Sequence, residues 1–238
     1  LSSLTTLTMD KDAGYFKTIS ATAGGQINLS GLTTLAVTPS NQTTLDFRMD
    51  TGGTIDLSHL QTIQPTAGVS NGRHRFYFEA NHTYALPELQ SSQAAEFHLG
   101  ASDVLDLPKL VTVQGGVGGF ELAANSTVNV PLLTTLSTES VTLGNNSHFQ
   151  APALTRLRDA TVTLATDSVF QAPLVNDLQN TLLTLSPGAT FTTAPLTNIL
   201  NARLAVQGGA TFNGLAPTTT SYTNNRAAHE TIFSATGS

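Results

Sequence analysis

Residues 141–157, VTLGNNSHFQAPALTRL, decide the fold of this chain. Apolar and polar residues alternate around Leu143 and Phe149, which is the period of two expected of a β-strand with one buried face. Gly144-Asn145-Asn146 and Pro152 separate the short apolar segments, and these are turn-forming residues. The stretch therefore predicts three short strands joined by turns, and no helix of useful length fits it.

The same phrase recurs along the chain. Its bulky anchor residue returns every 21 residues, at Val128, Phe149, Phe170, Phe191 and Phe212. Towards the N-terminus, equivalent anchors stand at Leu105, Tyr84, Ile55 and Ile27, with steps of 23, 21, 29 and 28 residues. Self-similarity at such a period is typical of solenoids, in which each unit buries its apolar edge against its neighbours.

We therefore predict an all-β protein, a three-faced parallel β-helix (β-solenoid) of about nine coils of 21 residues, with longer loops in the N-terminal coils. At roughly 4.8 Å per coil, nine coils make a rod about 43 Å long. In this interpretation residues 1–217 form a single β-solenoid domain, and residues 218–238 form a polar tail or a C-terminal cap.

Two columns of turn residues support the coil. The first corner carries residues that tolerate left-handed backbone or bond to their own main chain, namely Asp50, Asn81, Ser102, Asn125, Asn146, Asp167, Gly188 and Gly209. The next corner needs no ladder hydrogen bond and carries Pro87, Pro108, Pro131, Pro152, Pro173 and Pro195.

The phrase Val141-x-Leu143-x-x-Asn146-x-x-Phe149 resembles the coils of large secreted bacterial surface proteins and adhesins. More weakly, it resembles the leucine-rich-like repeat of receptor L domains. The resemblance covers about residues 16 to 217, and any three-sided solenoid needs a similar pattern. It implies a right-handed solenoid with a structural or adhesive role at a cell surface.

Composition narrows the function classes. The chain has 238 residues, no cysteine, 11% charged residues and a formal net charge of −6. Ten Lys and Arg without a basic stripe argue against nucleic-acid binding, and no segment approaches the roughly 18 apolar residues of a membrane span. The scattered histidines show no metal-ligand spacing. We predict no cofactor, no metal and a secreted or cell-surface location.

Ionisable residues gather in the coils that carry the insertions, which we place at residues 38–43, 64–73 and 115–119. With Phe47, Phe78, Leu99 and Leu122 pointing inward, one outward column would hold Asp46, Tyr77, His98 and Glu121, and the next would hold Arg48 and Glu79. Loops on a rigid scaffold carry most binding and catalysis. The candidate binding residues are Asp46, Arg48, Arg73, His74, Arg75, Tyr77, Glu79, His98 and Glu121.

Two interpretations of this patch are open. In one, it is a shallow carbohydrate-binding or hydrolytic site, with Tyr77 as a stacking platform and residues 73–75 reaching over from the loop. A lyase or glycosidase would need close carboxylates there. In the other, Arg48 pairs with Glu79 as an exposed ion pair and the remaining residues are solvated surface.

The function we predict is a non-enzymatic structural or adhesive solenoid segment that recognises a polysaccharide or surface glycan. With no convincing N-terminal cap, the chain is expected to associate end to end. The first alternative is a polysaccharide lyase or glycosidase with its site in coils 2 to 5. The second is an ice-binding protein, for which Thr190 and Thr192 make one Thr-x-Thr pair on a flat face.

Overall fold

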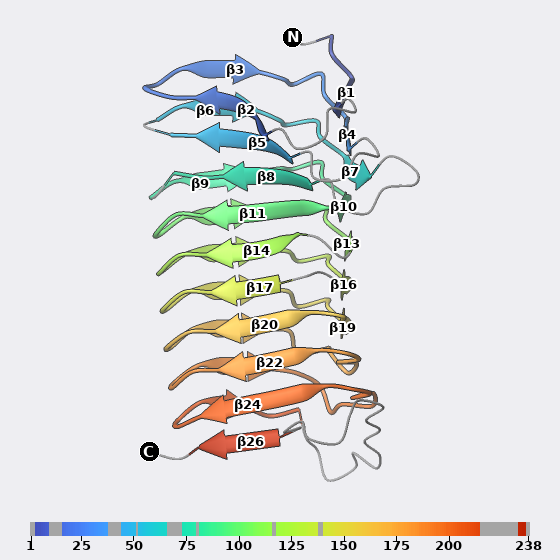
Figure 1. Cartoon of the computed structure of the whole chain (residues 1–238), viewed down its shortest axis with the longest axis vertical. Helices are drawn as coiled ribbons and strands as arrows, with labels where there is room; N and C mark the ends of the chain where they lie inside the picture. The colour runs from blue at the N-terminus through green and yellow to red at the C-terminus, as the bar shows by residue number, and fades with distance from the viewer. Residues whose placement is uncertain are drawn as a thin grey trace.

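The computed structural model describes residues 3–9, 16–37, 44–50, 52–65, 73–79, 81–115, 118–137, 140–214 and 233–236. Every regular element in these ranges is a β-strand, and the strands pair in parallel. The coils stack along one long axis, with β26 at the C-terminal end (Figure 1). The prediction of an all-β, three-faced β-solenoid is confirmed.

Sheet I, the first face of each coil, contains ten of the described strands. It begins at the N-terminal end, and each strand pairs with the equivalent strand of the next coil. Its members are β2 (Phe16–Ala21), β5 (Thr44–Met49), β8 (Arg73–Tyr77), β11 (Ala95–Leu99), β14 (Gly119–Leu122), β17 (Ser140–Leu143), β20 (Thr161–Leu164), β22 (Leu182–Leu185), β24 (Arg203–Gln207) and β26 (Phe233–Thr236).

Sheet II is the second face and carries the anchor residues. Among the described residues it has seven strands, β9 (Thr83–Ala85), β12 (Val104–Asp106), β15 (Thr127–Asn129), β18 (His148–Gln150), β21 (Val169–Gln171), β23 (Thr190–Thr192) and β25 (Thr211–Phe212). A separate pair, β3 (Gln26–Asn28) and β6 (Thr54–Asp56), holds the first two anchors.

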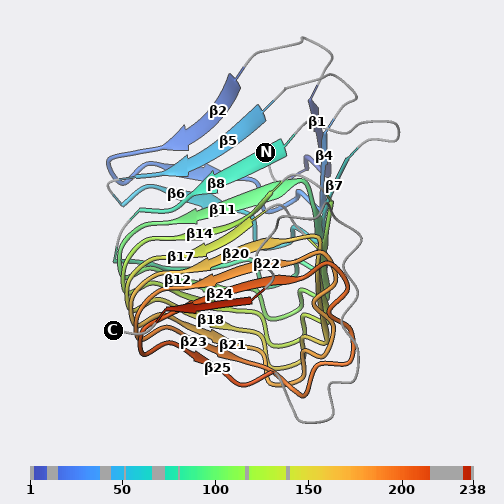
Figure 2. The same ribbon diagram turned by 60° about the horizontal axis from the view of Figure 1, so that its bottom comes forward.

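Sheet III is the third face and also has seven strands in the described part of the chain, β1 (Thr6–Met9), β4 (Thr34–Val37), β7 (Thr62–Pro65), β10 (Ser91–Gln93), β13 (Thr112–Gln114), β16 (Thr135–Ser137) and β19 (Arg156–Arg158). Beyond β19 this face continues as isolated parallel bridges at Asp177 and Asn198. The three faces enclose one interior, and Figure 2 shows the stacked coils obliquely from the C-terminal end.

The interior is a continuous apolar column. Phe149, Phe170 and Phe191 are fully buried and pair in register, with ring centroids 4.7 and 4.8 Å apart. A second run of stacked rings, Phe47, Phe76, Phe97 and Phe120, belongs to sheet I and meets Phe149 edge-on. The 21-residue spacing thus places identical side chains one above another, and each aromatic contact supplements the burial of apolar area.

The corner between sheets I and II confirms the predicted turn residues, with one correction. Positive φ angles of 57 to 73° occur at Asn81, Ser102, Asn125, Asn146, Asp167, Gly188 and Gly209. In the second coil the equivalent residue is Gly52, with a φ of 75°, and Asp50 lies two positions earlier. The sequence pattern pointed to Asp50 because aspartate and glycine both favour such turns, so residue type did not distinguish Asp50 from Gly52.

The proline corner is a regular four-residue turn. In five successive coils the backbone N–H two residues after the proline donates to the carbonyl just before it, as from Leu154 to Ala151 at 3.0 Å and from Val175 to Ala172 at 3.0 Å. Proline occupies the second turn position, where its fixed φ is favourable and its missing N–H costs nothing.

Part of the predicted insertions and tail lies outside the described residues. These parts are all of 38–43, residues 66–72 of the insertion at 64–73, residues 116–117 of the insertion at 115–119, and the tail at 218–238 apart from β26. In the described part of the chain, no helix is both long and apolar enough to cross a bilayer.

Candidate functional site: a polar network on sheet I

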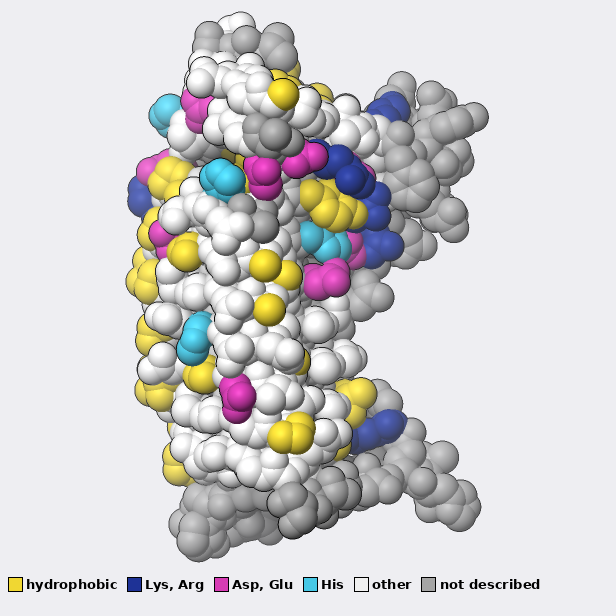
Figure 3. Space-filling view, turned by 90° about the vertical axis from the view of Figure 1, so that its left-hand side faces the viewer, with side chains coloured by type: hydrophobic (Ala, Val, Ile, Leu, Met, Phe, Trp, Pro, Cys, Tyr) yellow, Lys and Arg dark blue, Asp and Glu magenta, His cyan; other side chains and the backbone are white. Residues whose placement is uncertain are grey.

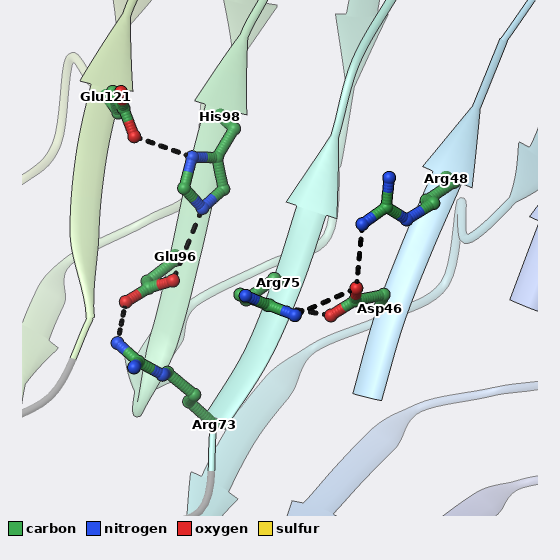
Figure 4. A network of polar contacts seen from close by, with 7 residues as sticks. All are labelled: Asp46, Arg48, Arg73, Arg75, Glu96, His98 and Glu121. Carbon is green, nitrogen blue, oxygen red and sulfur yellow. Dashed lines mark hydrogen bonds and ion pairs between the residues drawn. The ribbon is translucent and has the colours of Figure 1, made fainter. Parts of the chain in front are cut away.

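The outward positions of β5, β8, β11 and β14 bring the candidate residues together in two columns (Figure 4). Strand pairing places Asp46 beside Arg75, and Arg75 beside Glu96. The second column runs Arg48, Tyr77, His98 and Glu121. Because the strands are parallel and in register, side chains from four coils lie next to one another on one flat face.

Asp46 lies at the N-terminal end of the first column and joins it to Arg48 of the second. Its carboxylate accepts hydrogen bonds from Nε and Nη2 of Arg75 at 2.7 and 2.9 Å, and from Nη2 of Arg48 at 3.1 Å. The Asp46 side chain is only 3% exposed. Burial alone would lower the pKa of Arg75, but the hydrogen bond and the charge of Asp46 outweigh it and raise that pKa. The guanidinium of Arg75 is thus held in its charged form beside Asp46.

The ring of Tyr77 is sandwiched in the second column. The guanidinium carbon of Arg48, from the preceding coil, lies 4.3 Å from the ring centroid. The His98 ring, from the following coil, stacks at 4.5 Å with an interplanar angle of 12°. Burial raises the pKa of the Tyr77 hydroxyl. With a neighbour on each side of its ring, Tyr77 is a cation–π and stacking partner within the protein, and the predicted stacking platform would require one neighbour to move.

His98 links two carboxylates. Its Nδ1 lies 2.8 Å from Oε2 of Glu121 and its Nε2 lies 3.3 Å from Oε2 of Glu96. Glu96 also pairs with Arg73. Burial would raise the pKa of Glu96, but the hydrogen bond from His98 and the charge of Arg73 prevail, so its pKa lies below the ordinary value. The cluster therefore alternates cationic and anionic groups across the strands.

The register differs from the one expected from the sequence. Phe47 pairs with Phe76, not with Phe78, so Asp46 belongs with Arg75 and Arg48 with Tyr77. Glu79 lies just beyond the end of β8, where its Oε2 accepts a hydrogen bond from the Gly52 N–H at 2.7 Å. The ion-pair partner of Arg48 is Asp46, so the expected pairing with Glu79 is corrected.

Residues 73–75 open strand β8, whereas the sequence suggested that they reach over from a loop. Arg73 and Arg75 point outward into the network, but His74 points inward and is fully buried beneath it. Neither ring nitrogen has a hydrogen-bond partner among the described residues, and burial lowers the pKa of His74 to about 4. His74 is therefore a neutral interior residue rather than a binding residue.

Sequence reasoning missed Glu96. A signal was present, since Glu96 lies two residues before His98 and so faces the same side of its strand. Its importance depends on Arg73, however, which becomes a neighbour only through the pairing of β8 with β11.

The network is confined to the N-terminal coils. The column that begins with Arg48 and Tyr77 continues beyond Glu121 as Thr142, Thr163, Thr184 and Ala205. Figure 3 shows the same contrast, with basic, acidic and histidine side chains gathered over the upper part of the molecule and few charged side chains below.

The chemistry available to this face is recognition by charge-assisted hydrogen bonds. Three arginines and three carboxylates balance in charge, and each carboxylate has a cationic or histidine partner. No group of three or more His, Asp or Glu residues that could hold a metal ion occurs within the described ranges. The general acid of a glycosidase has a raised pKa, whereas the pKa of Glu96 is lowered, so Glu96 does not suit that role.

Fold and site together define a β-solenoid with a polar cluster on one face. Comparison with protein-family models, with curated proteins and with solved structures finds no match to this chain.

Proposed function

We propose that this chain is a non-catalytic, structural and adhesive segment of a secreted or cell-surface protein, and that the polar network on sheet I binds a glycan. The observation that carries the proposal is the linkage of three arginines, three carboxylates and His98 in one charge-balanced network on β5, β8, β11 and β14. A solenoid requires only polar outward residues for its stability, and threonine serves that purpose elsewhere in the same column. The charged side chains of the network are held in place by their neighbours. They are therefore preorganised to hydrogen-bond a hydroxyl-rich ligand, and binding need not order them.

Two exposed members of the network offer contacts to a ligand. The side chain of Arg48 is 48% exposed and that of Glu121 is 68% exposed. They stand at opposite ends of one column, with Tyr77 and His98 between them. A ligand that lies along the solenoid axis would thus meet a donor at one end and an acceptor at the other.

The test is a glycan array probed with the wild type and with the double variant Arg48→Gln, Glu121→Gln. These substitutions leave the buried pair of Asp46 and Arg75 intact. The matched control is Lys109→Gln, Glu88→Gln, which removes an ion pair at 2.7 Å at the proline corner with the same net charge change. We expect the first variant to lose at least tenfold in affinity and the control to bind as the wild type does.

Three outcomes separate the alternatives. Bound glycan that is not cleaved supports adhesion. Release of new reducing ends or unsaturated oligosaccharides would move the assignment to a carbohydrate-active enzyme. Absence of binding to every arrayed glycan would leave a structural role only. For ice binding the outward threonines would have to repeat from coil to coil, but Thr190 and Thr192 pair with Val169 and Gln171.

A further inference from the structure

A groove lies at the opposite end of sheet I from the polar network. It has a volume of about 420 Å³ and runs along the corner where the chain passes from sheet III into β20, β22 and β24. In Figure 1 this is the side from which these three arrows start. Its size falls within the range of about 300–1,000 Å³ typical of small-molecule sites. The groove is lined by Asp159, Ala160, Thr161, Asn180, Thr181, Leu182, Asn201 and Arg203.

A ladder of side chains forms the floor of the groove. Asn180 donates from Nδ2 to Oδ1 of Asp159 at 2.7 Å, and Asn201 donates from Nδ2 to Oδ1 of Asn180 at 2.9 Å. All three residues have positive φ angles, of 52, 55 and 56°. The same strained turn in three successive coils therefore holds three polar side chains in one line.

The ladder leaves hydrogen-bonding capacity in a fixed direction. An asparagine amide has two N–H donors and an oxygen with two lone pairs. Asn180 spends one donor and one lone pair on its neighbours, so one of each can face a ligand. Asp159 uses one carboxylate oxygen in the ladder, and the residue is exposed. An amide that presents both a donor and an acceptor suits the hydroxyl groups of a sugar, which also donate and accept.

The walls favour a neutral ligand with an apolar face. The lining contains one acidic and one basic side chain, Asp159 and Arg203, so it carries no excess charge. Leu182 is 36% exposed at an outward position of β22, where a hydrophilic residue is the rule in this fold. Thr161, at the same position of the preceding coil, adds a hydroxyl. A pyranose ring has this combination of polar edge and apolar face.

We propose that this groove is a second binding site, which takes one or two residues of a neutral saccharide. It stands on residues other than those of the polar network, and either site can exist without the other. Two sites on one face of a rigid solenoid would also favour multivalent attachment to a polymer.

The experiment titrates the ¹⁵N-labelled protein with maltotriose, cellotriose, xylotriose and chitotriose and follows backbone and Asn side-chain resonances. The first variant is Asn180→Gly, because glycine keeps the positive φ and removes only the side chain. The second is Leu182→Arg, which fills the groove without touching the ladder. The controls make the same changes elsewhere, Asn146→Gly at another positive-φ corner and Thr142→Arg at another exposed position of sheet I.

We expect at least one trisaccharide to shift the resonances of Asn180 and Leu182, with affinity reduced about tenfold or more in both groove variants and unchanged in both controls. The double variant Arg48→Gln, Glu121→Gln is expected to keep this binding, which separates the groove from the polar network. The inference is overturned if no trisaccharide perturbs the groove, or if Asn180→Gly and Leu182→Arg both bind as the wild type does.

Discussion

Arg75 and Asp46 form a two-pronged ion pair between adjacent coils, with Nε–Oδ1 and Nη2–Oδ2 distances of 2.7 and 2.9 Å. The carboxylate is almost fully covered, whereas the arginine side chain keeps 19% of its exposure. The pair joins β5 to β8 from outside, directly above the stacked rings of Phe47 and Phe76 inside. Its geometry combines charge, orientation and burial, which isolated surface ion pairs lack.

Removal of Arg75 should destabilise the protein more than removal of Arg48. Arg75→Ala leaves the buried Asp46 with Arg48 alone and is expected to lower the free energy of unfolding by roughly 3 kcal/mol, because an uncompensated buried charge is costly. Arg48→Ala, at a largely exposed side chain, should cost less than about 1 kcal/mol. Urea unfolding followed by circular dichroism measures both, and equal effects would contradict the central role of Arg75.

His74 should make the protein sensitive to acid. Its folded pKa of about 4 lies below the ordinary 6.5, so the unfolded chain takes up a proton at a pH where the folded chain does not. Its contribution to stability is therefore intact above about pH 6.5 and is lost progressively as the pH falls towards 4. The full loss is roughly 3 kcal/mol.

The measurement compares urea midpoints at pH 7 and pH 4.5 for the wild type and for His74→Leu. Leucine is apolar and removes two unsatisfied ring nitrogens, so this variant should be at least as stable as the wild type at pH 7 and lose less stability in acid. An identical acid loss in both proteins would assign the sensitivity to other groups.

The aromatic column predicts a large core effect. Phe170 is fully buried, with rings above and below at 4.7 and 4.8 Å. Phe170→Ala should cost about 3–5 kcal/mol, since it removes both contacts and leaves a cavity in a closely packed interior. Leu174→Ala serves as the control because Leu174 is 52% exposed, and its change should stay within about 0.5 kcal/mol. Comparable losses at the two positions would argue against a continuous core.

The corner between sheets I and II predicts opposite effects of two substitutions at one residue. Asn146 has a φ of 57°, which glycine adopts freely and a β-branched residue does not. Asn146→Gly should change stability by less than about 0.5 kcal/mol, whereas Asn146→Val should cost about 1–2 kcal/mol. Thermal unfolding of the two variants checks the difference, and a harmless valine would contradict the turn geometry.

Several features of the polar cluster were within reach of the sequence and others were not. The alternation of residues identified the outward faces of β5, β11 and β14, and it would also have revealed Glu96 beside His98. The residues of the groove recur as Asp159, Asn180 and Asn201, each 21 residues after the last, so the repeat already contained the ladder. Only the structure shows that these side chains line a groove.

The coil can be read from the sequence alone, because the 21-residue period, the inward apolar residues and the turn residues at each corner all require the same stack. The neighbours of each outward side chain in the irregular coils were decided only by the tertiary structure. His74, Phe76 and Phe78 all face inward, so shifting β8 by two residues preserves the buried face and leaves the pattern unchanged. Packing of Phe47 on Phe76 selects one register, and that choice alone brings Arg75 to Asp46 and Tyr77 to Arg48.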